Sequence, residues 1–327
     1  MKPKVFLAKQ VPNEVISFLT EHTEVEVWKG ESPIPRRELL NKIQEVEGLL
    51  LSGIKIDSQL LERAPHLKIV SNSSVGYNNF DIEKMAMHNV IGTHTPFVLD
   101  DTVADLAFGL ILSAARRIPE LDRFVKEGKW EEKLEDDLFG LDVHHKTIGI
   151  IGMGRVGEAI AKRAKLGFNM NVLYHNRNRK LDVETSLGAV YKKLNELLQE
   201  ADFVVLMVPL TEETKHLIAE REFSLMKQSA FFINTSRGET IDEQALIKAL
   251  ENKEIRGAGL DVFEQEPIDQ NHPFLKLDNV ITLPHIGSAT MQTRSQMAMV
   301  AAENLVAGVT GKIPKHVVPE LRGLVNP

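Results

Sequence analysis

The sequence predicts an α/β fold with two domains, each built around a parallel sheet. Short apolar, β-branched runs alternate with amphipathic segments over nearly the whole chain, which is typical of βαβ units whose strands are covered on both faces. A glycine-rich turn follows one of the later strands, and in a doubly wound sheet such a turn binds a dinucleotide. A length of 327 residues suits about two domains, each with its own core.

The first hundred residues alternate between expected strands and expected helices. The strands are predicted at 4–8, 25–28, 48–53, 67–74 and 90–95, and the helices at 13–22, 36–44, 58–64 and 80–89. Apolar runs without polar alternation favour parallel strands inside a layered sandwich. This part of the chain is therefore expected to form a flavodoxin-like domain.

One long helix is predicted next, over 99–130. Asp100 or Asp101 is expected to cap its start, and the run from Val103 to Ala115 is apolar on nearly every face. A helix that is apolar all round is usually buried. We therefore expect it to lie between domains or between the subunits of a homodimer.

The alternation then restarts with six more predicted strands, at 146–152, 171–175, 203–208, 230–235, 257–263 and 280–285. Such a series makes the two halves of a Rossmann-like, doubly wound dinucleotide-binding domain. A last helix, over 288–308, is expected to pack back on the first domain. The predicted division is a dinucleotide-binding domain at 100–287 inserted into a substrate domain at 1–99 and 288–327. Crossings near 96–100 and 284–288 suggest closure over a cleft.

Composition excludes several classes of protein. The formal net charge of −7 disfavours a nucleic-acid partner, which requires a basic face. The absence of Cys rules out disulfides, a thiol nucleophile and a thiolate metal site. No apolar run is long enough for a signal peptide or a membrane-spanning helix. A cytoplasmic protein without membrane contact is expected.

Gly152, Gly154 and Gly157 have G-x-G-x-x-G spacing between a predicted strand and a predicted helix. In that context the first glycine permits a tight turn and the second lets the backbone approach a pyrophosphate. The third allows the helix and the strand to pack closely. The N–H groups and partial positive charge at the helix start favour the phosphates, so these residues predict a dinucleotide site.

A basic segment stands where an acid usually binds the adenosine ribose. Asn176 occupies that place, and Arg177, Arg179 and Lys180 follow it. An amide does not repel a 2′-phosphate, and guanidinium groups pair with one. The segment therefore predicts NADPH as the cofactor. NADH is the alternative, if the segment is only a solvated loop.

Three fragments at the ends of later strands supply polar side chains: "INTSRGE", "GLDVFEQEP" and "LPHIGSAT". Ligands collect at such strand ends in an open α/β sheet. Arg237 suits a carboxylate or a polarised carbonyl. His285 can transfer a proton near neutral pH, with Glu266 to orient its ring.

Taken in order, these motifs resemble the D-isomer-specific 2-hydroxyacid dehydrogenase family. The resemblance covers essentially the whole chain and includes "SVGYNNFD", the glycine turn, "MVPLTEETKHLI" and the three fragments above. Within the family, the basic segment makes the chain most similar to the glyoxylate, hydroxypyruvate and 2-ketogluconate reductases. One departure is Asp105, in "TVAD", where the family usually has Glu.

The resemblance implies a role for each matching residue. His285 would be the general acid that protonates a 2-oxo acid, Glu266 its charged partner, and Arg237 the group that holds the substrate carboxylate and carbonyl oxygen. The N–H groups of Val75 and Gly76 would bind the substrate carboxylate. The residues implied to contact the cofactor are Thr102, Gly152, Gly154, Arg155, Val156, Gly157, Asn176, Arg177, Arg179, Val208, Pro209, Thr235, Asp261 and Gly287.

The implied reaction reduces glyoxylate, hydroxypyruvate or 2-ketogluconate to the D-2-hydroxy acid, with a hydride from nicotinamide and a proton from His285. Asp261 and the backbone near Gly287 would bind the nicotinamide carboxamide. An NAD-dependent, phosphoglycerate-like dehydrogenase is one alternative, although the expected lack of a further C-terminal domain weighs against it. Glu266 stands where formate dehydrogenases carry Gln, which argues against formate.

The sequence leaves one other class of function open and argues against two more. A nucleotide-sensing scaffold with little turnover stays open, because fold alone does not exclude it. His144 and His145 are adjacent and cannot both face one ion from a regular strand, so no metal is expected. No serine lies in a G-x-S-x-G elbow, which argues against a serine hydrolase.

Overall fold

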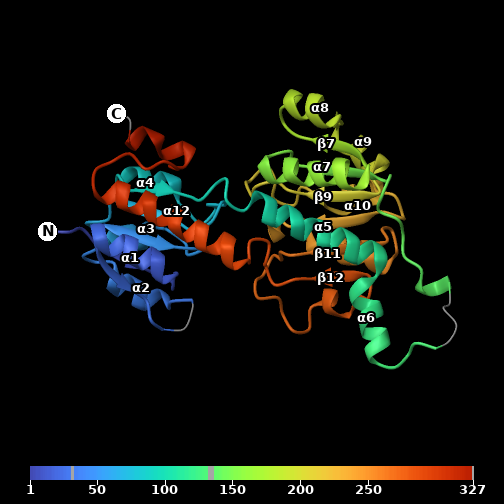
Figure 1. The fold of residues 1–327 in the computed structure, drawn as a ribbon, viewed down its shortest axis with the longest axis horizontal. Helices are drawn as coiled ribbons and strands as arrows, with labels where there is room; N and C mark the ends of the chain where they lie inside the picture. Colours follow the sequence, from blue (N-terminus) through green and yellow to red (C-terminus); the bar gives the residue numbers. More distant parts are fainter. Residues whose placement is uncertain (31–32, 132–135, 326–327) are drawn as a thin grey trace. The chain divides into compact units, whose positions relative to one another are not determined.

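The fold is taken from a computed structural model, which describes residues 1–30, 33–131 and 136–325. The chain divides into two compact units (Figure 1). Unit 1 comprises Met1–Leu99 with Ala289–Pro327, and unit 2 comprises Asp100–Ser288. The predicted domain ranges also include 31–32, 132–135 and 326–327, which lie outside the described residues. No helix in the described ranges is long and apolar enough to cross a membrane.

Unit 1 contains a parallel sheet of five strands in the order β2-β1-β3-β4-β5, the flavodoxin-like order. The strands are β1 (Lys4–Leu7), β2 (Glu24–Val27), β3 (Gly48–Leu51), β4 (Ile69–Asn72) and β5 (Ile91–Thr93). One face is covered by α1 (Asn13–His22) and α12 (Met291–Val309). The other is covered by α2 (Arg36–Lys42), α3 (Ser58–Arg63), α4 (Ile82–Met87) and η4 (Pro319–Leu324).

The sequence explains these elements locally. The strands β3 and β4 are buried along their whole length, as expected for strands that are covered on both faces. Asp57 caps α3 by accepting a hydrogen bond from the Leu60 N–H (3.0 Å), and Asp81 caps α4 in the same way. In α12, Gly308 lies so close to Ile69 that a Cβ atom there would be 2.5 Å from its side chain. The helix therefore packs directly on β4.

Unit 2 contains a parallel sheet of seven strands in the order β12-β11-β10-β9-β6-β7-β8, which is the Rossmann order with one further strand. The strands are β6 (Thr147–Ile151), β7 (Asn171–His175), β8 (Val190–Tyr191), β9 (Phe203–Leu206), β10 (Phe231–Asn234), β11 (Gly257–Leu260) and β12 (Val280–Thr282). The prediction of α/β architecture with two Rossmann-like sheets is confirmed. The prediction of six strands here is wrong, because β8 pairs through only two residues and is too short for an apolar pattern.

Helices cover both faces of the unit 2 sheet. One face carries α5 (Asp100–Arg116), α7 (Arg155–Phe168) and α8 (Leu181–Leu187). The other carries α9 (Leu194–Glu200), α10 (Glu220–Leu225) and α11 (Glu243–Glu251). Short 3-10 turns complete the unit: η1 (Asp136–Leu138), η2 (Gly238–Thr240) and η3 (Pro273–Lys276).

The single long helix expected over 99–130 is two helices. Arg117 adopts a left-handed conformation (φ 56°) between α5 and α6 (Ile118–Lys126), and Pro119 lies in the first turn of α6, where a missing N–H costs nothing. The side chains of Asp100 and Asp101 pair with arginines of α7, at 3.1 Å from Arg155 and 3.0 Å from Arg163.

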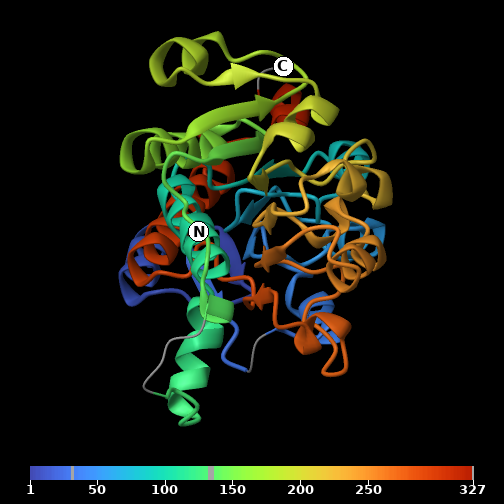
Figure 2. The same cartoon turned by 90° about the vertical axis from the view of Figure 1, so that its right-hand side faces the viewer.

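The buried face of α5 packs on α7 and on β10 and β11 of its own sheet. Its apolar character is thus explained inside unit 2, contrary to the expectation of burial between domains or subunits. Asp105, the departure from the family pattern, lies 2.7 Å from Arg163. In contrast, α6 has no buried residue, and Figure 2 shows it extending beyond the layers of its own unit.

Candidate active site

The predicted catalytic residues follow three neighbouring strands of unit 2. Arg237 comes after β10, Glu266 lies in the segment after β11, and His285 comes after β12. These strands are adjacent and parallel, so their carboxyl ends meet at one edge of the sheet. The structure therefore brings together side chains that are up to 48 residues apart in the sequence.

His285 and Glu266 form a hydrogen-bonded ion pair, with His285 Nδ1 2.6 Å from Glu266 Oε2. The other carboxylate oxygen accepts the N–H of Phe263 at 3.1 Å, so both oxygens are fixed. Burial acts to raise the pKa of Glu266, but the hydrogen bond and charge of His285 outweigh it and the pKa is lowered. The two side chains keep 46% and 36% of their surface exposed, which leaves the pair open to a ligand.

Arg237 lies on a turn that packs tightly against the Glu266 segment. A Cβ atom on Gly238 would lie 1.9 Å from the Phe263 carbonyl carbon, so only glycine permits this approach. The turn is held by Asn234, whose side-chain amide donates to the Arg237 carbonyl at 3.0 Å. Burial lowers the pKa of the Arg237 guanidinium, and the charge of Glu266 opposes that shift. The arginine thus acts electrostatically on the same carboxylate as His285.

Asp261 fixes the loop that carries His285. Its two carboxylate oxygens accept the N–H groups of Ile286 and Gly287, each at 2.7 Å. Burial raises the pKa of Asp261, against the effect of these two hydrogen bonds. The Gly287 N–H is thereby engaged by Asp261. Sequence reasoning placed Asp261 near the cofactor but missed this contact, whose only signal was the adjacency of β11 and β12.

The glycine turn joins β6 to α7 and fits a dinucleotide. Gly152 has φ +106°, and a Cβ atom there would lie 2.4 Å from the Met207 carbonyl oxygen and 3.1 Å from Val208. In contrast, a Cβ atom on Gly154 would have no atom within 4 Å, which leaves room beside the backbone at the start of α7. The backbone is thus tightly packed at Gly152 and has open space beside it at Gly154. This arrangement suits the approach of a pyrophosphate.

The basic segment after β7 is only partly available for a phosphate. Asn176 Oδ1 accepts the Met153 N–H at 2.7 Å and so braces the glycine turn. Arg179 makes two hydrogen bonds to Glu184, one of them Nε to Oε1 at 3.0 Å. Arg177 forms an ion pair with Glu213 at 3.3 Å, and both side chains are largely exposed. Arg177 is therefore less engaged than Arg179.

The remaining predicted cofactor contacts lie at the same edge of unit 2. Thr102 is in the first turn of α5, next to Val103, and a Cβ atom on Gly287 would lie 3.5 Å from the Val103 side chain. The others follow strand ends or open the helix after the glycine turn: Arg155 and Val156 begin α7, Val208 and Pro209 follow β9, and Thr235 follows β10.

In unit 1, a loop after β4 exposes a row of backbone donors. We call residues 74–77 the amide loop. The four carbonyls of this loop all accept hydrogen bonds from within unit 1. None of the four N–H groups of these residues forms a hydrogen bond in the described part of the chain, and the residues are only partly buried. Consecutive N–H groups that form no hydrogen bond within the protein can bind an anion. Val75 and Gly76, predicted from sequence, are the central pair.

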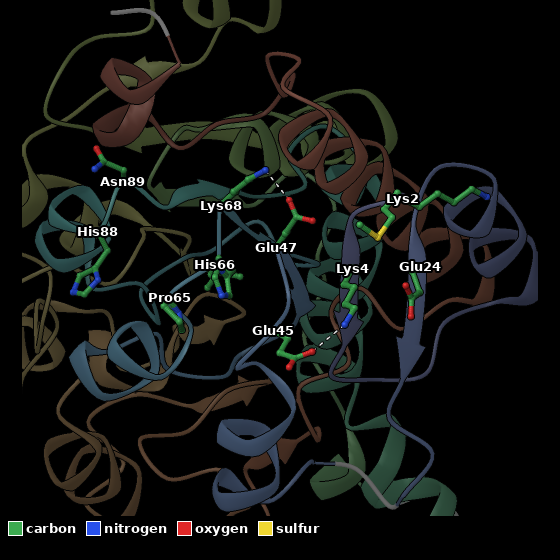
Figure 3. A pocket seen from close by; sticks show the side chains of 12 residues that line it. Lys2, Lys4, Glu24, Glu45, Glu47, Pro65, His66, Lys68, His88 and Asn89 are labelled. Atoms are coloured by element: carbon green, nitrogen blue, oxygen red, sulfur yellow. Dashed lines mark hydrogen bonds and ion pairs between the residues drawn. The ribbon is translucent and has the colours of Figure 1, made fainter.

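A hollow in unit 1 lies at the opposite edge of its sheet (Figure 3). It is lined by charged residues at the amino ends of the strands, and several are already paired, as in Lys4–Glu45 at 2.9 Å and Lys68–Glu47 at 2.6 Å. The pairs are exposed and weak. The hollow is remote from the amide loop along the strands and contributes nothing to the candidate site.

Comparisons with known proteins show the family of the chain. Residues 108–287 match the family model of the D-isomer specific 2-hydroxyacid dehydrogenase NAD binding domain. A glyoxylate reductase of Pyrococcus horikoshii is 50% identical over 323 residues, covering 97% of this chain and 96% of the relative. A glyoxylate/hydroxypyruvate reductase B of Klebsiella pneumoniae is 48% identical, covering 97% and 98%.

A solved structure is similar along the whole chain. It is an NADPH-dependent glyoxylate/hydroxypyruvate reductase of Sinorhizobium meliloti in complex with NADP and malonate. Its TM-score is 0.86 at 31% identity, and the match covers 98% of each chain.

Proposed function

The chain belongs to the D-isomer specific 2-hydroxyacid dehydrogenase family and is an NAD(P)-dependent 2-oxoacid reductase, and we propose that it reduces glyoxylate and hydroxypyruvate with NADPH. The observation that carries this proposal is the His285–Glu266 pair at 2.6 Å beside Arg237. An imidazole held by a carboxylate, next to a guanidinium, can protonate a carbonyl oxygen while its charge is stabilised. The relatives named as glyoxylate reductases support the choice of substrate.

The chain's own residues would act as follows. Glu266 holds His285 through Nδ1, which leaves Nε2 to give its proton to the carbonyl oxygen. Arg237 binds the same oxygen and the substrate carboxylate, because its planar fork offers several donors. The N–H groups of Val75 and Gly76 bind the carboxylate as well. NADPH, when bound, supplies the hydride that adds to the carbonyl carbon.

Residues of unit 2 would hold the dinucleotide. The glycine turn and the start of α7 would bind the pyrophosphate, with Arg155, Val156, Val208 and Pro209 around it. Asp261 would reach the nicotinamide carboxamide through lone pairs that Ile286 and Gly287 leave unused. We propose that Arg177 binds the 2′-phosphate more than Arg179 does, since Arg179 would first have to leave Glu184.

We also propose that the chain is a homodimer. The helix α6 has no buried residue, yet Ile118 and Val125 each expose 51% of their surface. An amphipathic helix that extends beyond its own unit is a natural place for a second copy. Light scattering should give the mass of a dimer, and Val125→Asp should shift the protein toward the monomer.

The test of the function is a kinetic panel. The purified protein is assayed with glyoxylate, hydroxypyruvate and 2-ketogluconate, each with NADPH and with NADH. We expect the highest kcat/KM with NADPH and one of the first two acids, and we expect His285→Ala to lower kcat by a factor of about 100 or more. Wild-type protein that binds NADPH but reduces none of the three acids would contradict the proposal. So would a His285→Ala variant with normal turnover.

A further inference from the structure

The amide loop is fixed through its carbonyls, two of them by backbone groups. The Thr95 N–H donates to the Ser74 carbonyl, and the Phe80 N–H donates to the Tyr77 carbonyl, each at 2.9 Å. The peptide bond is planar and trans, so a carbonyl and the N–H of the next residue point in opposite directions. Holding the Ser74 carbonyl inward therefore turns the Val75 N–H outward, without help from any side chain.

The next carbonyl is held by a side chain. His94 Nδ1 lies 2.9 Å from the Val75 carbonyl oxygen, and because that oxygen only accepts, Nδ1 carries the proton. By the same planarity, this contact turns the Gly76 N–H outward. Asn72 does the same one residue later, with Nδ2 2.9 Å from the Gly76 carbonyl.

The His94 ring is itself well placed to hold the loop. Its backbone N–H donates to the His316 carbonyl at 3.1 Å, and its carbonyl accepts from Asn304 of α12 at 3.4 Å. The ring packs edge-on against Tyr77, with centroids 5.3 Å apart at 84°. His94 is thus anchored on both sides of its own chain and against the loop it contacts.

We propose that His94 is a positioning residue, whose ring orients the Gly76 N–H toward the carboxylate of the substrate. The inference rests on the proposed reduction of a 2-oxo acid, in which Val75 and Gly76 bind that carboxylate. His94 does not touch the substrate; it acts through the Val75–Gly76 peptide. Because Thr95 orients the Val75 N–H independently, His94 governs one of the two hydrogen bonds.

The test compares two substitutions at position 94. His94→Leu removes the hydrogen-bond donor and fills the position with an apolar side chain of moderate size. His94→Asn keeps a donor, because the Asn amide nitrogen is as many bonds from Cα as His Nδ1. Loss of one hydrogen bond should raise the KM for glyoxylate about three- to tenfold in His94→Leu. The kcat and the KM for NADPH should change less than about twofold, and His94→Asn should restore most of the affinity.

Direct binding separates this inference from the proposed reaction. The Kd of oxalate, measured by calorimetry on protein saturated with NADP, should rise in His94→Leu by the same factor as the KM. If the wild-type protein binds oxalate but does not reduce glyoxylate, the proposed substrate is wrong and the oxalate Kd values alone decide the role of His94. If His94→Leu does not fold, His94→Gln takes its place as the variant without the donor. The Gln amide nitrogen is one bond farther from Cα than His Nδ1, so it is not placed to donate to the Val75 carbonyl oxygen.

Three results would overturn the proposal. The first is an unchanged oxalate Kd in a folded variant that lacks the donor. The second is an equal rise in the KM for NADPH, which would indicate a general structural effect. The third is a His94→Asn variant as impaired as His94→Leu.

Discussion

At the scale of single residues, Glu266 has two separable functions. One oxygen holds the backbone at Phe263 and the other holds His285. Glu266→Gln can keep the first contact through its amide oxygen but removes the negative charge beside the imidazole. We expect kcat for glyoxylate to fall about 100-fold, with the Kd of NADPH unchanged by fluorescence titration. A variant with normal kcat would show that the charge of Glu266 is not needed for proton transfer.

The lowered pKa of Glu266 predicts how the free energy of unfolding depends on pH. Because this pKa is lowered in the folded state, the ionised carboxylate contributes stability above its unfolded-state pKa. That contribution is lost as the pH falls through the folded-state pKa. Urea unfolding of the wild type and of Glu266→Gln between about pH 7 and pH 3 should give a difference that shrinks toward acid.

Only the difference between the two proteins isolates Glu266. The pKa of Asp261 is raised by burial, so protonation of Asp261 is favoured in the folded state. Its effect on stability has the opposite sign in the same pH range. The main part, which comes from burial, is present in both proteins and cancels, whereas the smaller part that comes from the charge of Glu266 is lost in Glu266→Gln. A difference that stays constant down to the lowest pH would contradict the assigned direction for Glu266.

At the scale of elements, Asp261 couples the ends of β11 and β12. Both of its oxygens accept backbone N–H groups of the His285 loop. Asp261→Asn can satisfy one of these N–H groups, and its own NH2 then faces the other. We expect a loss of about 1–3 kcal/mol in the free energy of unfolding and a fall in kcat, because His285 is no longer held in place. Thermal unfolding and steady-state rates measure the two effects.

Asp261→Glu offers a matched control. It keeps the charge and both acceptors but shifts them by one methylene, so the loop would have to move with them. We expect an activity between those of the wild type and Asp261→Asn. If Asp261→Asn left both stability and kcat unchanged, the coupling of the two strand ends would be irrelevant to catalysis.

The elements that sequence predicted well have long or distinctive patterns. The α1 prediction over 13–22 agrees with the observed bounds, because its apolar residues have helical spacing. The break at Arg117 was missed although Pro119, two residues later, signals it. A proline inside an otherwise helical pattern ends or kinks the helix, but the apolar spacing continues on both sides of the break. The proposed catalytic residues were selected by their types at strand ends. The contacts of Asp261 and the pairing of Arg179 with Glu184 depend instead on how neighbouring segments meet. Periodicity in one sequence does not report such contacts.

At the scale of the whole molecule, each unit has its own sheet and core, and each carries a different part of the proposed chemistry. Unit 1 presents the amide loop for a carboxylate, and unit 2 presents the glycine turn and the basic segment for a dinucleotide. Selectivity for the acid and selectivity for the cofactor should therefore be separable by mutation. Asn176 in unit 2 and His94 in unit 1 provide the variants.

Asn176→Asp keeps an acceptor for the Met153 N–H and adds a carboxylate where a 2′-phosphate would bind. We expect the ratio of kcat/KM with NADPH to that with NADH to fall about tenfold or more, with the KM for glyoxylate unchanged.

His94→Leu should raise the KM for glyoxylate and leave the ratio of kcat/KM with NADPH to that with NADH unchanged. Sites without shared partners give additive free energies within about 0.5 kcal/mol, so the double variant should show both changes at full size. A coupling well above that value in the double-mutant cycle would mean that the acid and the dinucleotide are sensed by one cooperative site, and the separation of roles between the units would then be wrong.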